Sequence, residues 1–561
     1  MDITDTSRST SPKYAISPKL AKNELLAIPL FIISLILFII LAPVLILFAI
    51  LRIAVSLILK QGHGKNYGGL VEREATWLKT ADMPLINIVT ILHSKISSPE
   101  ALLSHLKQCL LGPLSQSNAQ KLTSVCNSFM GYAYYLNNQV TIDDICNTIA
   151  VDGEKEFLDK NVLTDILGDL ASRAMPKGNS GLFEVLVVNK PLKKVDNDTY
   201  KYAVIFRVNH IVADGIALTN FFLQSLADDQ GQLKRSFKEL VAKFDASKTK
   251  KANTTGWQRI IQILRHIKMF MVYLPIILAN SRSSEDRNCL HGPNLSGKKI
   301  SVYAAEKKGE GLMLAVKQIK RRVTGSTFSS VVLTAISRVI GRHMLKKEDN
   351  SPNFVNVMMT ALFSIPNMEE TPILANYFSL AKLDMPLFRN SEDVNCQIGL
   401  MEKYWNEVKE KPDFLVNYLV SRYLFGVLPI PLLKQLFDEV KITMSVSNLP
   451  GVPKLRVLEG QQVEQLVFFT HNHGTMGVSF TIMTYDNKFQ IGLTIDTVFD
   501  CTKEEAQSLV HEVLKEIREM HKELDFGQLG LSKSKGLAID TQYENKDTKN
   551  TASLCLSSSD R

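Results

Sequence analysis

The feature that most restricts this chain is a run without any charged residue from Leu25 to Leu51. After Arg52 the apolar character resumes from Ile53 to Leu59. A helix of about 20 apolar residues is enough to cross the hydrocarbon core of a bilayer. A secretory signal has a shorter apolar region and a small-residue cleavage site, so the run predicts an uncleaved membrane anchor over residues 25–59.

Two geometries are open for this anchor. It is either a single tilted transmembrane span or a re-entrant hairpin, bent at Pro43, that returns both ends to the same side. Lysine or arginine residues flank both ends of the run, so a charge asymmetry does not set its orientation. Residues 1–24 and 531–561 are polar, and we predict that they form disordered tails.

The length and charge of the chain restrict the region beyond the anchor. A chain of 561 residues with 45% hydrophobic residues suits two domains of roughly 200 to 250 residues each. The net charge of +9 is spread out and does not form a basic stripe with interleaved aromatics, so nucleic-acid binding is not expected. A mildly basic surface instead suits anionic lipid head groups and the phosphates of an anionic small molecule.

Apolar periodicity after the anchor alternates between strand and helix, which indicates the α/β class. We expect a flexible connector at 62–69 and a polar domain boundary at 281–299, which gives an N-terminal domain at 70–285 and a C-terminal domain at 300–530. The pattern predicts strands at 85–92, 182–188, 202–208, 354–363 and 376–383, and helices after Ser98, at 313–322, at 328–345 and after Thr502.

Two further segments are amphipathic. The segment from Trp257 to Ala279 is apolar but carries four basic residues and Pro275, so it is either an interfacial helix or a core helix between the domains. Arg422 to Leu433 could rest on the same lipid surface.

The strongest chemical signal lies where the strand predicted at 202–208 ends. His210, Asp214 and Gly215 form an HxxxDG pattern there. Neutral imidazole takes and returns a proton near neutral pH, so His210 is the candidate general base. Asp214 is predicted to accept backbone N–H bonds or to pair with an arginine, and Gly215 to let the backbone turn. The alternative is a satisfied histidine at a strand end followed by an ordinary helix cap.

These residues resemble the wax ester synthase/diacylglycerol acyltransferase (WS/DGAT) family, whose signature is HHxxxDG. The resemblance covers roughly residues 75–525 and includes, besides NHIVADG, the segments ATWLKTADMP, SGLFEVLVV, VKQIKRRVTGSTFSSVVLTAISRVIGRHM, ANYFSLAKLDMPL, SVSNLPGV and VSFTIMTYDNKFQIGLTID. It implies two linked chloramphenicol-acetyltransferase-like α/β domains with a tunnel between them, where acyl-CoA and an alcohol meet at His210. No permanently bound cofactor is implied, since acyl-CoA is the donor substrate.

The resemblance also carries over residues of the second half. Asn376 matches a family asparagine, and Ser447, Asn448 and Gly451 match its SNxPG loop, so these are possible oxyanion or tunnel residues. From the residues alone, Asn448 is equally well part of a turn, and Asn376 could cap a strand. The sequence departs from the family at Asn209, which replaces the first histidine, and at Ser329 and Ser330, where Asn-Asp is usual.

The resemblance implies an enzyme that transfers a fatty acyl group from acyl-CoA to a long-chain alcohol or diacylglycerol, giving wax esters or triacylglycerol. We expect it at the endoplasmic reticulum membrane, or at a lipid droplet or the plasma membrane, with cytosolic catalytic domains. The alternatives are an inactive lipid-binding scaffold and a CoA-dependent acyltransferase for a sterol or an amine. His471 and His473 alternate along the chain, but without an evident third ligand no metal site is predicted.

Overall fold

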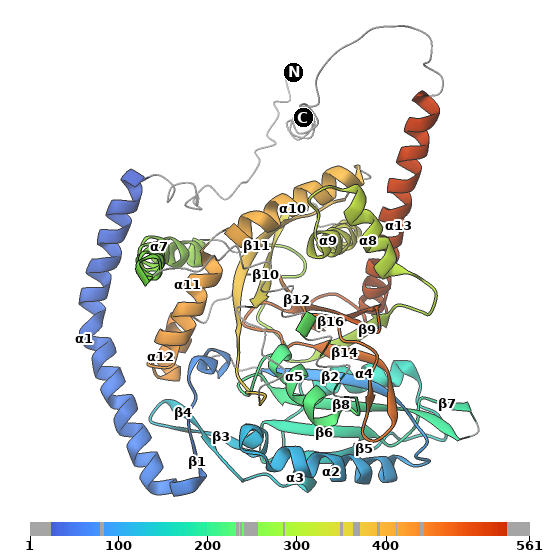
Figure 1. Ribbon diagram of the computed structural model, residues 1–561, viewed down its shortest axis with the longest axis horizontal. Helices are drawn as coiled ribbons and strands as arrows, with labels where there is room; N and C mark the ends of the chain where they lie inside the picture. The colour runs from blue at the N-terminus through green and yellow to red at the C-terminus, as the bar shows by residue number, and fades with distance from the viewer. Residues whose placement is uncertain are drawn as a thin grey trace.

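The chain folds into two mixed β-sheets with helices on their outer faces and a long N-terminal helix along one side, as a computed structural model shows (Figure 1). The structure describes residues 24–535 except 79–83, 179, 197, 230, 232–234, 236–237, 240–255, 284–285, 348–351, 363–370, 390–392, 411 and 438–441. The tails predicted at 1–24 and 531–561 therefore lie almost entirely outside the described residues.

The first sheet has the strand order β13-β14-β2-β8-β6-β5, and β7 pairs with β8 at its side. Its strands are β2 (Leu85–Ser94), β5 (Cys146–Ile149), β6 (Phe183–Val188), β7 (Lys193–Asp196), β8 (Thr199–Asn209), β13 (Arg456–Val457) and β14 (Gln461–Phe469). The strands predicted at 85–92, 182–188 and 202–208 are confirmed as β2, β6 and β8. These three runs are almost wholly buried, as their apolar composition requires.

The second sheet has the order β11-β10-β12-β15-β16-β9. Its strands are β9 (Lys299–Ala305), β10 (Phe354–Leu362), β11 (Phe378–Pro386), β12 (Met444–Asn448), β15 (Val478–Tyr485) and β16 (Lys488–Asp496). The strands predicted at 354–363 and 376–383 are confirmed as β10 and β11. Both β10 and β15 pair in parallel with β12, while the outer pairs are antiparallel.

Helices cover the outer faces of both sheets. They are α2 (Pro99–Ser115) and α5 (Gly215–Leu226) at the first sheet, and α8 (Leu312–Arg322), α9 (Phe328–Lys346), α10 (Val394–Glu410) and α13 (Lys503–Lys535) at the second. Helix α4 (Lys160–Leu170) packs on the opposite face of the first sheet and against β9 of the second. The predicted starts are confirmed, because the Ser98 hydroxyl caps α2 and Thr502 and Glu505 bond reciprocally before α13. Helix α13 continues to Lys535, beyond the predicted start of the tail at Leu531.

One segment is exchanged between the two halves of the chain. Strand β14 comes from the second half, yet it pairs antiparallel with β2 in the first sheet. Residues 470–477 then lead directly to β15 in the second sheet. The two sheets are thus tied together by this crossing segment, which reaches the interface between them.

A small sheet of β1 (Tyr67–Leu70), β4 (Tyr132–Leu136) and β3 (Val125–Phe129) joins the body to the N-terminal helix. The prediction of a flexible connector at 62–69 is wrong, because β1 pairs with β4. Gly68 allows this pairing, since a Cβ there would lie 2.9 Å from Tyr135 Cβ. The remaining elements are η2 (Gly64–Asn66), η3 (Arg73–Leu78), η4 (Ser117–Thr123), α3 (Ile142–Ile145), α7 (Gly256–Ser283), α11 (Asp413–Val420), η5 (Ser421–Phe425) and α12 (Ile430–Phe437).

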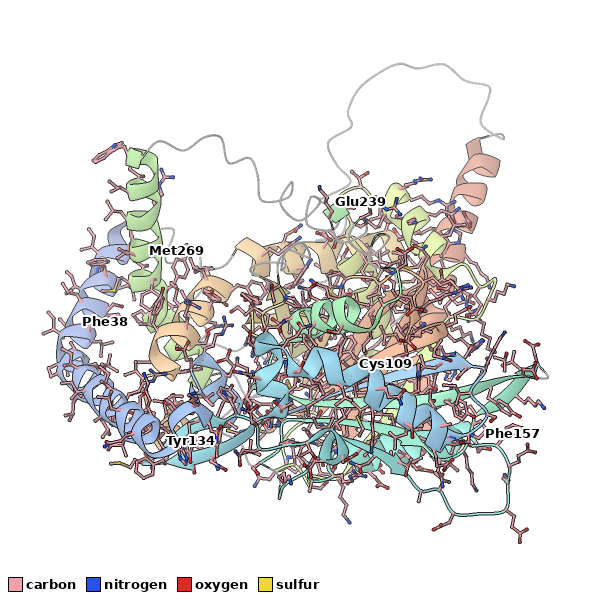
Figure 2. The ribbon with its side chains drawn as sticks, turned by 60° about the horizontal axis from the view of Figure 1, so that its bottom comes forward. Phe38, Cys109, Tyr134, Phe157, Glu239 and Met269 are labelled. Atoms are coloured by element: carbon pink, nitrogen blue, oxygen red, sulfur yellow. The ribbon has the colours of Figure 1, made fainter. Side chains whose placement is uncertain are left out.

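The predicted anchor forms one helix, α1 (Glu24–His63), which is long and apolar enough to cross a membrane by length and composition. It is continuous through Pro43, whereas a re-entrant hairpin would reverse direction there. Figure 2 shows α1 beside α7 near Phe38 and beside the small sheet near Tyr134. The Phe38 and Phe270 ring centroids are 6.0 Å apart, and Arg52 Nε donates to Gly426 O at 2.7 Å.

Helix α7 combines features of both alternatives predicted for 257–279. Its first half exposes Trp257 and Leu264, as an interfacial helix does. Its second half buries Met271 and Ile276, as a core helix does. The segment 422–433 likewise has one exposed ring, Tyr423, and buried leucines.

Candidate active site

The motif histidine directly follows the last residue of β8. Side chains alternate along a strand, and Phe206 and Val208 of β8 belong to the main core of the first half. His210 continues on that face, and its backbone N–H donates to Pro84 O at 2.6 Å. The side chain is 7% exposed, so the ring is almost enclosed.

Asn376, from the second half of the chain, holds the His210 ring. His210 Nδ1 lies 3.0 Å from Asn376 Oδ1. The Asn376 amide donates from Nδ2 to His210 O at 3.1 Å and to Glu74 Oε1 at 3.4 Å. These two acceptors fix which way the amide faces, so Oδ1 is the atom directed at the imidazole.

This arrangement selects one tautomer of His210. Because Asn376 Oδ1 can only accept, Nδ1 must carry the hydrogen. Nε2 then has the lone pair, and among the described residues it has no hydrogen-bond partner. Burial lowers the pKa of His210 to about 4, so the ring is neutral at physiological pH. A neutral imidazole with a free Nε2 is the form that a general base requires.

Asp214 does not touch the imidazole but connects the motif to Asn376. Its Oδ1 accepts from Ile216 N and Ala217 N at the start of α5, as an N-cap does. Its Oδ2 accepts from Tyr377 N at 2.6 Å. Burial raises the pKa of this carboxyl, while the three backbone N–H groups oppose that shift. Asp214 therefore fixes the position of residue 376 relative to residue 210.

The other predicted residues lie around the start of α5 and the end of β12. A Cβ on Gly215 would come within 2.8 Å of Leu449 Cδ1, so glycine lets the SNxPG loop approach the motif. Ser447 and Asn448 are the last residues of β12 and pair with Thr481 and Ile482 of β15. Beyond them, a Cβ on Gly451 would collide with Thr484 Oγ1. These residues shape the loop, and no described contact joins them to the His210 ring.

Asn209 and Ser330, at which the sequence departs from the family, each form hydrogen bonds with nearby residues. Asn209 Oδ1 accepts from Ile211 N at 3.1 Å, and Asn209 N donates to Leu182 O. Its side chain therefore stabilises the turn that follows β8. Ser330 completes the capping box with Thr327 at the start of α9.

Aromatic rings enclose the catalytic candidate, and sequence reasoning did not associate them with it. Trp77 lies 4.5 Å from His210 between ring centroids, and Phe378 lies 5.4 Å away. His471, from the crossing segment after β14, is 5.8 Å from His210 and edge-on to Trp77. The available signals in the sequence were ATWLKT, within the family resemblance, and the alternation of His471 and His473, from which no metal site was predicted.

The described groups that could hold a metal include His105, Cys109 and Glu459, whose ligand atoms lie within 4.8 Å of one another. They lie on α2 and on the turn between β13 and β14. His471 and His473 do not belong to this group. Their rings instead contact Trp77, with His473 at 5.9 Å.

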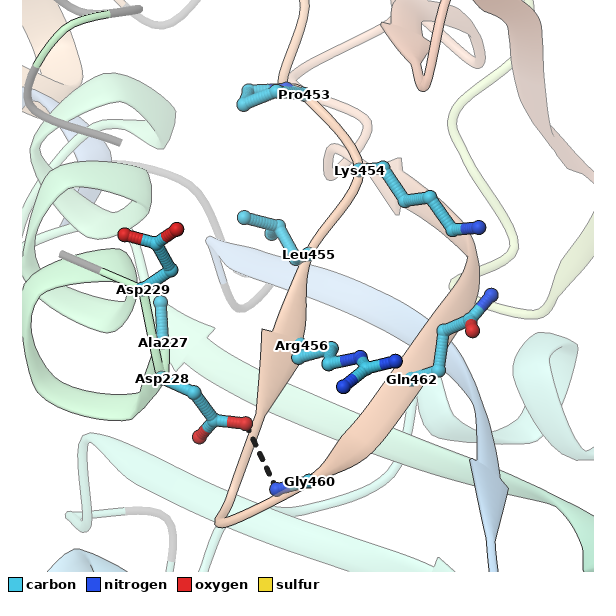
Figure 3. Close-up of a pocket in the computed structure, with 9 residues that line it drawn as sticks. All are labelled: Ala227, Asp228, Asp229, Pro453, Lys454, Leu455, Arg456, Gly460 and Gln462. Atoms are coloured by element: carbon cyan, nitrogen blue, oxygen red, sulfur yellow. Dashed lines mark hydrogen bonds between the residues drawn. The ribbon is translucent and has the colours of Figure 1, made fainter. Parts of the chain in front are cut away.

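A pocket of about 570 Å³ lies at the far end of α5, between Ala227–Asp229 and the β13–β14 hairpin (Figure 3). Asp228 closes its rim by accepting from Glu459 N and Gly460 N. Since α5 rises about 1.5 Å per residue from Gly215, this pocket lies about 18 Å from the motif. It is distinct from the tunnel predicted at His210, which stays a prediction.

Comparison with known proteins places this geometry in context. Residues 374–521 match the family described as "WS/DGAT C-terminal domain". This range includes Asn376, the SNxPG loop and His471. No match to a curated protein was found.

Solved structures with low sequence identity and TM-scores above 0.5 share the fold. Trichothecene 15-O-acetyltransferase TRI3 from Fusarium sporotrichioides is 12% identical, with a TM-score of 0.54 over 80% of this chain and 94% of that chain. The first condensation domain of the CDA synthetase is 12% identical, with a TM-score of 0.52 over 82% of this chain and 96% of that chain. The wax ester synthase/diacylglycerol acyltransferase from Marinobacter aquaeolei VT8 is 12% identical, with a TM-score of 0.49 over 81% and 97%.

The family match and the fold agree with the resemblance seen in the sequence. The match covers the second half only, whereas the fold likeness extends over both sheets. Residues 374–521 thus match the WS/DGAT C-terminal domain, and the whole chain has a two-domain α/β fold like that of the acetyltransferase and condensation-domain structures.

Proposed function

We propose that this protein is a membrane-bound O-acyltransferase that moves a fatty acyl group from acyl-CoA to a long-chain alcohol or diacylglycerol, with His210 as general base. The observation that carries the proposal is the contact of His210 Nδ1 with Asn376 Oδ1. This contact leaves the Nε2 lone pair for the substrate. The WS/DGAT match supports the substrate class.

The reaction needs one base, because a thiolate is already a good leaving group. His210 Nε2 takes the proton of the acceptor hydroxyl as its oxygen attacks the thioester carbonyl carbon. The carbonyl electron pair moves to oxygen, giving a tetrahedral oxyanion. When that pair returns, the C–S bond breaks, and the CoA thiolate takes the proton from the imidazolium. Asn376 and Asp214 act as positioning residues for the ring.

The long apolar helix supports a location of this protein at a membrane, where the acceptor and the product are also found. Both dissolve in a bilayer, so a reaction centre held at its surface meets them at high effective concentration. Large apolar side chains face outward along α1, among them Ile39 and Leu47. We expect the protein at the endoplasmic reticulum membrane, with the lipid droplet and plasma membrane as the other locations to test.

The test is a labelled acyl-CoA assay on full-length protein in detergent or nanodiscs, with hexadecanol and diacylglycerol as separate acceptors. His210→Ala should lower kcat by at least about a hundredfold, because general-base catalysis contributes roughly that much. Asn376→Ala should lower kcat roughly tenfold to a hundredfold, since the tautomer is then no longer fixed. Thermal unfolding of each variant separates these losses from misfolding.

Asn137→Ala is the matched control. Asn137 is also a buried asparagine with side-chain hydrogen bonds, but its partners are Ser124 and Gln120, and no described contact joins it to His210. Its variant should retain the wild-type kcat. Equal rates for wild type and His210→Ala would reject the base. Absence of turnover on either acceptor would favour a lipid-binding scaffold. Turnover only on a sterol or an amine would show that the acceptor belongs to that class instead.

A further inference from the structure

A second histidine faces the same reaction centre. His471 lies on the segment that crosses from β14 to β15, and its ring is 5.8 Å from that of His210, with an interplanar angle of 78°. Trp77 packs against both imidazoles, edge-on to His471 at 5.0 Å between centroids. The fold thus places two imidazoles from distant parts of the chain beside each other and against the same indole ring.

Neither nitrogen of His471 has a hydrogen-bond partner among the described residues. The side chain is only 9% exposed. A buried polar group without a partner costs about 1 to 3 kcal/mol, so such groups are rare unless a ligand completes them. The loop around His471 is otherwise well bonded, because Asn472 Nδ2 donates to Gly477 O and Asn472 Oδ1 accepts from Ser479. The His471 imidazole therefore lies in a loop whose neighbouring Asn472 is fully hydrogen-bonded, and both of its own ring nitrogens are left for a ligand.

We propose that His471 is a second catalytic residue of the acyl transfer, whose ring N–H donates to the thioester carbonyl oxygen as that oxygen becomes an oxyanion. This role rests on the proposed function, and it deepens it by supplying the donor that the reaction needs. His210 removes the hydroxyl proton, and His471 stabilises the negative charge that appears on the carbonyl oxygen. No proton leaves His471 during the cycle.

The charge state of His471 suits a donor. Burial, followed by the proximity of the His210 and His473 imidazoles, holds the pKa of His471 well below its usual range. The ring is then neutral and has one N–H group. A fixed neutral donor in a site that excludes water stabilises a developing oxyanion more than it would in water.

Trp77 Nε1 is the competing donor in the same cluster, because it is also buried without a partner among the described residues. The indole N–H cannot change its position without moving a ring packed against His210, Phe378 and His471. Trp77→Phe removes this N–H while keeping an aromatic ring. This variant is therefore included in the same experiment, to test Trp77 as the alternative donor.

The test compares kcat and KM for acyl-CoA in wild type, His471→Phe, His471→Gln, His471→Asn and Trp77→Phe. His471→Phe should lower kcat about 100-fold to 1,000-fold with little change in KM, as removal of an oxyanion donor does. The amide of glutamine replaces the Nε2 position, and that of asparagine the Nδ1 position. One of these two variants should recover at least about tenfold over His471→Phe, which identifies the donating nitrogen.

His343→Phe is the matched control, because His343 is also a buried histidine with an unpaired Nε2, but it lies on α9. This variant should keep the wild-type kcat. If His471→Phe is as active as the wild type while His210→Ala is inactive, the role of His471 is wrong and the proposed function stands. A loss confined to KM, or a loss in Trp77→Phe only, would overturn it as well. A wild type without turnover on either acceptor would overturn the proposed function and this role together.

Discussion

His210 is held in one chemical form by residues that are far apart in the chain. Glu74 and the His210 carbonyl orient the Asn376 amide, and that amide orients the imidazole. Asp214 fixes the segment that carries Asn376 by accepting from Tyr377 N. The result is a neutral ring with Nε2 available, in an enclosure where burial disfavours the imidazolium.

The lowered pKa of His210, about 4, predicts how activity depends on pH. A base must be neutral, and a lowered pKa keeps it neutral in more acidic solution than the usual value of about 6.5 allows. We expect kcat/KM to stay level from about pH 8 to 5.5 and to fall below about pH 5. The pH profile of the labelled acyl-CoA assay measures this. If kcat/KM has already fallen to half its plateau value near pH 6.5, the pKa of His210 is not lowered by burial, and this prediction is wrong.

The lowered pKa of His210 also makes the stability of the fold depend on pH. Between about pH 4 and 6.5 the unfolded chain binds a proton at residue 210 and the folded chain does not, so acidification over this range destabilises the fold.

Strand β8 has different roles on its two faces. One face leads through Val208 to His210, and the other carries Arg207, which is fully buried. Arg207 pairs with Glu184 of β6 and donates to Leu170 O at 2.9 Å. Arg173 adds a second ion pair to Glu184 at 2.6 Å. This buried network ties β6, β8 and the end of α4 together three residues before the catalytic candidate.

Glu184→Ala should therefore destabilise the protein by about 3 to 5 kcal/mol, because it leaves the buried Arg207 charge without its carboxylate. Chemical or thermal unfolding in detergent measures the change. Asp143→Ala is the control, since Asp143 pairs with Lys107 but is 78% exposed. That variant should change stability by at most about 1 kcal/mol. Similar effects for the two variants would show that the buried pair has no special role.

In the whole molecule, α1 is part of the folded body. Its Val55 and Leu59 side chains are buried with Leu70, Tyr132 and Tyr134 of the small sheet. Contacts with α7 near Phe38 and with Gly426 near Arg52 continue the interface along the helix. One side of α1 is thus packed on protein, and the opposite side is an exposed apolar surface.

Aspartate substitutions on the two sides of α1 should have different effects. Val55→Asp places a charge in a fully buried site, so we expect lost folding and aggregation. Leu57→Asp changes a side chain that is 62% exposed, so the fold should persist while membrane association weakens. Size-exclusion chromatography in detergent reports the first effect, and vesicle flotation the second. If α1 were an independent tether, Val55→Asp would leave the folded body intact.

Local patterns were sufficient for several of the elements and for the catalytic candidate. Strands such as β2, β6 and β8 read as buried apolar runs, and helix starts such as those after Ser98 and Thr502 have capping residues in adjacent positions. The motif likewise lies within a few residues of one strand end. The prediction failed at β1, whose glycines suggest a free connector, because its pairing with β4 depends on a partner more than 60 residues away.

The sequence alone therefore determined the α/β alternation, the apolar helix and the histidine at the end of β8. Only the tertiary structure decided that β14 crosses into the first sheet and that residues 74, 376 and 471 meet around His210. The physical reason is that periodicity and capping act over a few residues. Strand exchange and side-chain contacts depend instead on how two whole sheets pack, and no local spacing encodes that packing.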